Sequence, residues 1–340
     1  MTWKVAWSWQ AEHRIATLCA ALDGVVVSSG MDAIMLDGEG NQRWSAKMPF
    51  RIHGLASDSS SIAILCGHGF HVLDLRDGTP ISEGRSTPSG FNDILARPGG
   101  GWILSCREGN LHLYDAKGKG IRRLAAGGLR RLIGFFDREH LLWHDESGAI
   151  ICARMTEEDS FRKIEGRAWS WTSRLYQGRL LLQHADGSLY EGLPHAYGWD
   201  SLEQIEASSL EPMEAVRCSD GWWVLGIEGR LVTISSDAES PETPAGELLI
   251  TSGSATMISA TIDGLVRWWQ APHLAEQLDR ERRQFVAETR MMMDWEARRD
   301  VFKRAREAEE MGRTSLAAEL YSSLGREEDH LRVLRKMSED

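Results

Sequence analysis

The sequence lacks long apolar runs and any close grouping of cysteines. No stretch of about 18 apolar residues occurs, and the first residues have neither the apolar core nor the small-residue cleavage site of a secretory signal. The 5 cysteines are odd in number and widely spaced, without a Cys-x-x-Cys pair, which favours reduced, buried thiols over a disulfide framework. These absences predict a cytoplasmic protein without membrane insertion.

Motifs that carry chemistry are also missing. The 11 histidines are scattered, and no zinc-type His-Glu-x-x-His, serine-hydrolase elbow or phosphate-binding Gly-Lys loop is present. His144 and His184 could meet as a metal pair at the ends of second strands in adjacent repeats, although structural histidines held by hydrogen bonds are the favoured interpretation. The sequence predicts no catalytic residue, no metal and no cofactor.

Positive charge is in deficit. The formal net charge is -11, whereas phosphate neutralisation requires a clustered basic surface. Arginines do recur between residues 282 and 304, but acidic residues interleave with them, as on a solvated helix face. The charge distribution therefore argues against nucleic acid as a partner.

What the sequence has is a repeat. Its clearest copy, residues 101–115, joins a short apolar run, a turn with glycine and a second alternating run that ends in aspartate, which is a β-hairpin pattern. The turn glycines follow one another at intervals of 35 to 42 residues. They are Gly30, Gly69, Gly109, Gly148, Gly187, Gly229 and Gly264. Seven copies at this period predict an all-β seven-bladed β-propeller.

The two ends of the repeat region are expected to join. Residues 3–9 alternate with tryptophan on one face, and the last repeat, residues 248–269, supplies only three strands. Pairing of residues 3–9 with residues 265–269 would complete the last blade and remove an exposed edge. A loose N-terminal arm is the alternative. We expect a propeller over residues 1–271.

Particular residues resemble known propeller families. In the first repeat a turn with aspartate and glycine leads to Trp44, as in the quinoprotein-type repeat, and Leu73-Asp74 and Tyr114-Asp115 are similar to the Trp-Asp pair of WD-repeat proteins. The resemblance implies the architecture and leaves function open, since propellers host unrelated activities.

From Pro272 the hydrophobic period changes to that of a helix, which predicts a short all-α region over residues 272–340. Ala305, Ala308, Gly312, Ala317 and Tyr321 resemble a single tetratricopeptide-type hairpin, in which small residues let two helices approach and an aromatic fills the seam. One such unit cannot bury its own face. It is expected to pack on the propeller, on a second copy of the chain or on a partner.

Two surfaces are candidate partner-binding sites. Arginines near the start of several inner strands could form a collar at the channel mouth for an acidic peptide or a phosphate; the alternative is unrelated surface arginines paired with aspartates. The tail carries a methionine-rich apolar face, which could instead cover its own domain. The candidates are Arg14, Arg51, Arg130, Arg131 and Arg174 at the mouth, and Phe285, Met292, Trp295 and Phe302 on the tail.

The leading hypothesis is a non-enzymatic protein-protein interaction scaffold or subunit of a multiprotein complex. The propeller would be the binding platform, and the helical tail, which could also self-associate, the assembly element. The alternatives are an accessory propeller subunit of an ATPase system and a quinoprotein-like propeller enzyme. The enzyme family would imply export and a clustered acidic and aromatic site, and the sequence shows neither.

Overall fold

The computed structural model describes most of the chain. It covers residues 3–339 apart from 22–23, 59, 85–86, 156–160, 165, 208–209, 235–240, 242–244, 254, 273, 275, 277–298, 300, 312 and 325. The chain divides into two compact units, Met1–Ala275 and Glu276–Asp340. Among the described residues, no helix combines the length and apolar composition needed to cross a membrane.

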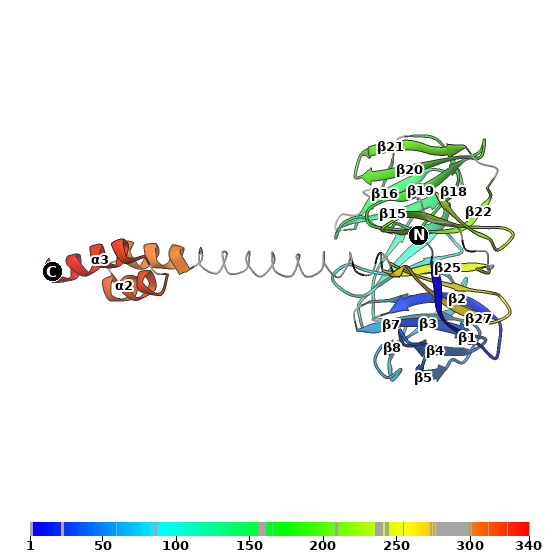
Figure 1. The fold of residues 1–340 in the computed structure, drawn as a ribbon, viewed down its shortest axis with the longest axis horizontal. Coiled ribbons are helices and arrows are strands. Elements are labelled where there is room, and N and C mark those ends of the chain that lie inside the picture. Colours follow the sequence, from blue (N-terminus) through cyan, green and yellow to red (C-terminus); the bar gives the residue numbers. More distant parts are fainter. Residues whose placement is uncertain are drawn as a thin grey trace. The chain divides into compact units, whose positions relative to one another are not determined.

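Seven antiparallel sheets form the first unit, which is a seven-bladed β-propeller (Figure 1). Blades 1 to 3 contain β2 (Ile15–Ala21), β3 (Gly24–Ser29), β4 (Asp32–Leu36) and β5 (Gln42–Lys47); β6 (Ile52–Ser57), β7 (Ser61–Cys66), β8 (Gly69–Asp74) and β9 (Pro80–Gly84); and β10 (Phe91–Ala96), β11 (Trp102–Cys106), β12 (Asn110–Tyr114) and β13 (Gly120–Ala125).

The remaining blades follow the same order. Blades 4 to 7 contain β14 (Leu129–Phe135), β15 (His140–Asp145), β16 (Ile150–Arg154) and β17 (Phe161–Lys163); β18 (Trp169–Thr172), β19 (Leu180–His184), β20 (Ser188–His195) and β21 (Gly198–Ala207); β22 (Pro212–Cys218), β23 (Gly221–Gly226) and β24 (Leu231–Ile234); and β25 (Leu248–Gly253), β26 (Thr256–Ala260), β27 (Leu265–Gln270) and β1 (Lys4–Gln10). The predicted blade number is confirmed.

The recurring glycines make the turns between second and third strands. Six of the seven adopt a positive φ, which glycine tolerates because it has no Cβ. In blade 2 the left-handed residue is Gly67, with φ of 57°, and Gly69 already belongs to β8. The repeat therefore predicts the turn correctly and misplaces its strained residue by two positions.

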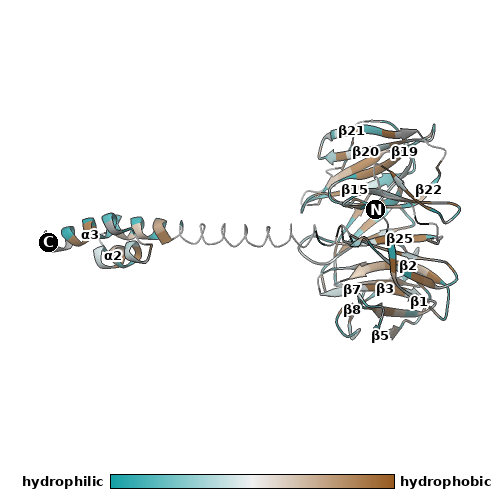
Figure 2. Ribbon diagram, in the orientation of Figure 1, coloured by the Kyte–Doolittle hydropathy of each residue, from teal (hydrophilic) through white to brown (hydrophobic). Residues whose placement is uncertain are grey.

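Apolar side chains fill the spaces between neighbouring blades. In Figure 2, many of the hydrophobic residues, coloured brown, lie on the strands. One cluster joins Met35 of blade 1 to Ile64 of blade 2, and the other clusters of the propeller repeat this arrangement. Cys66 and Cys106 end β7 and β11 and pair with the first residues of β6 and β10, so they occupy equivalent buried positions in their blades. All 5 cysteines are free.

The N-terminal strand closes the ring. β1 pairs antiparallel with β27, so the predicted pairing of residues 3–9 with the last repeat is confirmed and blade 7 gains its fourth strand. Trp3, which precedes β1, is 5% exposed; its ring meets Trp223 of blade 6 at 5.5 Å, and its Nε1 donates to Asp220 at 2.8 Å. The first residues therefore fasten blade 7 to blade 6.

The same segment also contacts blade 1. Trp7 stacks on Trp268 and donates through Nε1 to the carbonyl of Gly38 at 2.9 Å. Trp44, on the outer strand of blade 1, makes the equivalent bond to the carbonyl of Leu75 in blade 2 at 3.0 Å. The tryptophan after the aspartate-glycine turn thus docks one blade on the next.

The second unit contains a helical segment at 301–310, α2 (Thr314–Ser323) and α3 (Glu327–Glu339). Its core holds Ala305, Ala308, Ala317 and Tyr321, which are four of the five positions of the tetratricopeptide-like pattern; the fifth, Gly312, lies outside the described residues. Small side chains allow close helix contact, and the Tyr321 ring fills the seam beside Phe302. The predicted helical hairpin is confirmed.

Glu309 ties these helices together. It accepts hydrogen bonds from Lys336 and Arg332, each at 2.8 Å, and from the hydroxyl of Tyr321 at 3.2 Å. The bonds from Lys336 and Arg332 lower the pKa of Glu309 to about 2. Because the folded pKa lies below the ordinary value, the stabilisation is complete above about pH 4.5 and is lost as the pH falls toward 2.

Glu309→Gln should therefore loosen the hairpin at neutral pH and remove most of its sensitivity to acid. Hydrogen exchange of the α2 and α3 amides, corrected for intrinsic rates, measures both effects at pH 6 and pH 3. Glu319→Gln, an exposed change on α2, is the matched control. Equal protection in wild type and Glu309→Gln at pH 6 would contradict this role.

Candidate functional site: the central channel and its mouth

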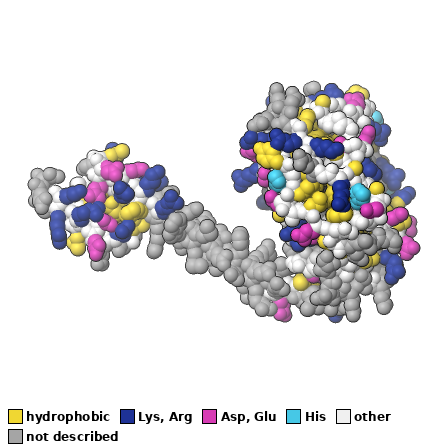
Figure 3. Space-filling model, turned by 90° about the horizontal axis from the view of Figure 1, so that it is seen from above, with side chains coloured by type: hydrophobic (Ala, Val, Ile, Leu, Met, Phe, Trp, Pro, Cys, Tyr) yellow, Lys and Arg dark blue, Asp and Glu magenta, His cyan; other side chains and the backbone are white. Residues whose placement is uncertain are grey.

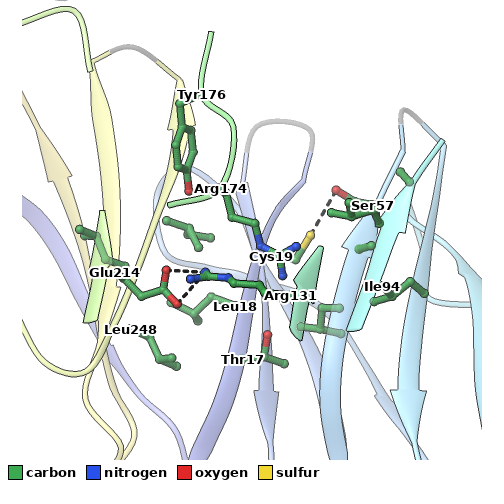
Figure 4. Close-up of a pocket in the computed structure, with 16 residues that line it drawn as sticks. Thr17, Leu18, Cys19, Ser57, Ile94, Arg131, Arg174, Tyr176, Glu214 and Leu248 are labelled. Atoms are coloured by element: carbon green, nitrogen blue, oxygen red, sulfur yellow. Dashed lines mark hydrogen bonds and ion pairs between the residues drawn. The ribbon is translucent and has the colours of Figure 1, made fainter. Parts of the chain in front are cut away.

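The first strand of every blade faces the central channel. These strands all begin at one side of the ring, which we call the mouth face. A cavity of about 400 Å³ lies in the channel, and residues from all seven blades line it (Figure 4). Its charged members are Arg131, Arg174 and Glu214.

Arg131 of β14 points into this cavity and is neutralised there. Its Nη2 donates to both carboxylate oxygens of Glu214 in blade 6, at 2.9 and 3.1 Å, and its Nη1 donates to the carbonyl of Thr172 in blade 5 at 3.1 Å. The side chains are 23% and 29% exposed. One guanidinium therefore braces three blades.

Arg174 forms a second brace in the opposite direction. Its Nη2 donates to Asp93 of blade 3 at 2.7 Å, and its Nη1 donates to the carbonyl of Leu132 in blade 4 at 2.7 Å. Burial acts to lower the pKa of Arg174, but the carboxylate of Asp93 more than offsets this and raises the net value. The charge of each channel arginine is thus balanced by a carboxylate.

A thiol completes the polar lining. Cys19 lies 3.3 Å from the hydroxyl of Ser57, which donates to the carbonyl of Ala20 at 2.7 Å. Burial raises the pKa of Cys19 above its ordinary value. The thiol therefore stays protonated at neutral pH, and a protonated thiol is a poor nucleophile.

The structure divides the predicted arginine collar into two sets. Arg14 and Arg51 directly precede β2 and β6, and Arg130 is the second residue of β14; all three are exposed at the mouth face. Arg131 and Arg174 lie deeper, because successive residues of a strand point to opposite sides and because Arg174 follows the end of β18. Only the first set presents positive charge at the mouth.

The predicted tail residues are mostly outside the described part of the chain. Phe285, Met292 and Trp295 fall there, as do the two methionines that flank Met292. Phe302 is described, and it packs within the hairpin: the guanidinium of Arg326 lies 4.5 Å from the centre of its ring. Phe302 therefore contributes to the internal packing of the tail.

His144 and His184 both lie beside Trp169. The Nε2 atom of His144 is 3.1 Å from the carbonyl of Trp169, and the ring of His184 meets the indole of Trp169 edge-on. Burial lowers the pKa of His144. Within the described ranges, no group of three or more potential metal ligands occurs.

Sequence analysis missed Asp93 and Glu214, the partners of the channel arginines. Asp93, Arg131 and Glu214 each stand two residues after the first residue of an inner strand. An alignment of the repeats on the first residue of each inner strand would have shown that these three charged side chains lie at the same depth in the channel. Which charges pair across it depends on the closed ring.

Comparisons with known proteins show the architecture. No protein-family model and no curated protein matches the sequence. BamB from Moraxella catarrhalis superposes with a TM-score of 0.56 and 16% identity, covering 80% of this chain and 98% of that one. The β-propeller domain of Cps50 (Swd1) from Myceliophteria thermophila superposes with a TM-score of 0.64 and 12% identity, covering 79% and 99%.

At these identities the matches show the fold alone. They agree with the resemblance to WD-repeat and quinoprotein-type propellers that the repeats indicate. Together with the seven sheets, they establish the fold of the protein: a seven-bladed β-propeller, followed in the chain by a helical C-terminal region.

Proposed function

We propose that the protein is a non-enzymatic interaction scaffold, with the ring as the binding platform and the helical tail as the assembly element. The contrast between its two sets of arginines carries the proposal. Arg131 and Arg174 are neutralised inside the channel, whereas Arg14 and Arg51 are exposed and make no salt bridge to a carboxylate within the described part of the chain. Unpaired guanidinium groups on an acidic protein favour an acidic partner segment.

The rigidity of the ring supports the same role. The braces of Arg131 and Arg174 link blades 3 to 6, and the N-terminal segment links blades 6, 7 and 1. A closed platform loses little conformational entropy when it binds, because its loops are already positioned. Such a platform suits recognition of a segment contributed by another protein.

Apolar side chains on the tail support its role in assembly. Met311 is 70% exposed and Leu331 is 52% exposed, and Leu316 and Leu334 are exposed as well. Figure 3 shows hydrophobic side chains among basic and acidic ones on this unit. A further helix, from a partner or a second copy of the chain, would cover such a face.

Affinity purification from the native source tests the proposal. We compare the full chain with a chain that ends at Ala275, after thermal unfolding has shown that the shortened chain folds. The full chain should capture proteins in stoichiometric amounts, and the shortened one should keep those that dock on the ring and lose those held by the tail. Absence of any stoichiometric partner of the full chain, or turnover of a substrate in the channel, would contradict a scaffold.

An accessory role in an ATPase system is a special case of the same proposal, and it would place an ATPase among the captured proteins.

The cellular location follows from the thiols. The 5 free cysteines favour a reducing compartment, so we propose that the protein is cytoplasmic.

A further inference from the structure

A second cavity lies on the mouth face, away from the channel braces. It has a volume of about 680 Å³, and its walls come from the loop before β6, the β7–β8 turn, the loop before β10 and the β11–β12 turn. We call it the mouth groove. Its polar and aromatic lining consists of Phe50, Arg51, His53, His68, Ser89, Phe91, Asn92 and Arg107.

We propose that the mouth groove binds an acidic segment of a partner protein, with a large apolar side chain next to its carboxylates. The inference rests on the proposed scaffold function and assigns it a site. A volume of this size lies within the range of about 300–1,000 Å³ that is usual for pockets holding small ligands. A few side chains of an extended segment fit such a space.

Charge is the first argument. No acidic residue lines the groove, and the exposed side chains of Arg51 and Arg107 make no ion pair within the described residues. The carboxylate next in sequence, Glu108, is held by Arg123 at 3.2 Å. Two guanidinium groups without a protein carboxylate therefore face the hollow, where the carboxylates of a ligand can pair with them.

The histidines add donors or acceptors that the protein does not use. The Nε2 atom of His53 lies 3.1 Å from the carbonyl of Phe91, and the Nδ1 atom of His68 lies 3.1 Å from the carbonyl of Pro88. A carbonyl can only accept, so these nitrogens carry the protons. Each imidazole is held in place by that bond, and its second ring nitrogen makes no hydrogen bond within the described residues.

Phe50 supplies the apolar wall. Its side chain is 60% exposed, which is unusual for a phenylalanine. The ring lies against Gly67, where a Cβ would come within 2.8 Å of the Phe50 ring. The aromatic surface is thus supported from below and open to the groove, where it can contact an apolar side chain of the ligand.

The acidity of the whole chain selects a short segment over a long polyanion. A long nucleic acid extends beyond the groove and is repelled there by the acidic surface, since the chain has a net charge of -11. A short peptide stays within the groove, and salt screens it from acidic residues more than about 8–10 Å away. Local basic charge on an acidic protein therefore favours a peptide whose carboxylates are few and close together.

Fluorescence anisotropy with the full-length protein tests the site. The probe is a fluorescein-labelled peptide of four glutamates around one phenylalanine, and its counterpart has glutamine in place of each glutamate. Wild type should bind the glutamate probe and not the glutamine one, with affinity falling as salt rises. The double variant Arg51→Gln, Arg107→Gln should lose at least about 10-fold in affinity, since charge-assisted bonds are the strong ones.

Two further variants make the test specific. Arg76→Gln removes an exposed arginine from the β8–β9 turn on the opposite face, and it should leave binding unchanged. Phe50→Ala should weaken binding about 3–10-fold without altering the salt dependence, as expected for lost apolar contact. Equal thermal stability of all variants shows that folding is unaffected.

The proposal is overturned if wild type does not bind the glutamate probe, or if the double arginine variant binds it as tightly as wild type. Affinity purification with the same double variant separates this from the scaffold function. If native partners are still captured but the glutamate peptide does not bind, the groove is not the binding site, and the proposed scaffold function is retained. If wild type captures no partner at all, the scaffold function itself fails.

Discussion

Replacing Trp3 with alanine is expected to lower the free energy of unfolding of the propeller by about 3–5 kcal/mol, the usual range for a buried aromatic side chain. Trp3 is 5% exposed, contacts Trp223 and donates a hydrogen bond to Asp220. The substitution therefore creates a cavity, leaves a carboxylate oxygen without its donor and releases blade 7 from blade 6. Urea denaturation, followed by tryptophan fluorescence and by circular dichroism, measures the change.

Val5→Ala is the matched control, because Val5 lies on the same closing segment and is 38% exposed. It should cost less than about 1 kcal/mol, as surface substitutions usually do. Loosening of β1 should also expose the edge of β27, so the Trp3 variant should self-associate at high protein concentration. Equal stability of the two variants would show that the segment does not hold the ring closed.

Asp93→Ala is expected to cost about 3 kcal/mol, the lower end of the range for removing one partner of a buried ion pair. The Asp93 side chain is 19% exposed, and it balances Arg174 in the channel. It also accepts the backbone N–H of Leu132 at 3.1 Å. Its loss leaves the Arg174 guanidinium without a carboxylate and the Leu132 amide without an acceptor, and it weakens the connection between blades 3, 4 and 5.

A double-mutant cycle identifies the cause of this loss. Adding Arg174→Met to Asp93→Ala removes the unpaired charge and should recover more than half of the lost stability. Asn92→Ala, at the exposed neighbouring position, should change stability by less than about 0.5 kcal/mol. If the losses of the two single variants simply add in the double variant, the pair does not act as one unit.

Local signals made the fold predictable. The number of blades follows from the spacing of turn glycines such as Gly109. Each glycine marks one β-hairpin, and the residues that specify the hairpin lie within about 15 positions of the sequence. The closing strand follows from alternation in residues 3–9, and the tail hairpin from small residues such as Ala305 and Ala317. Each of these features depends on neighbours in sequence and on backbone geometry.

The site was only partly predictable. Arginines near the starts of inner strands indicated a binding site at the mouth, and in the structure Arg14 and Arg51 are exposed directly before β2 and β6. The sequence could not separate them from Arg131, whose partner Glu214 stands 83 residues away. The mouth groove was missed as well, because its walls come from four loops that span residues 50 to 107.

The sequence by itself determined the repeated hairpin, the number of blades, the strand that closes the ring and the helical tail. Only the tertiary structure decided which charges cancel and which remain open to a partner. The reason is physical: secondary structure responds to the period of apolar residues along the chain, whereas electrostatic neutralisation depends on distances of a few ångströms between blades. Those distances exist only after the ring has closed.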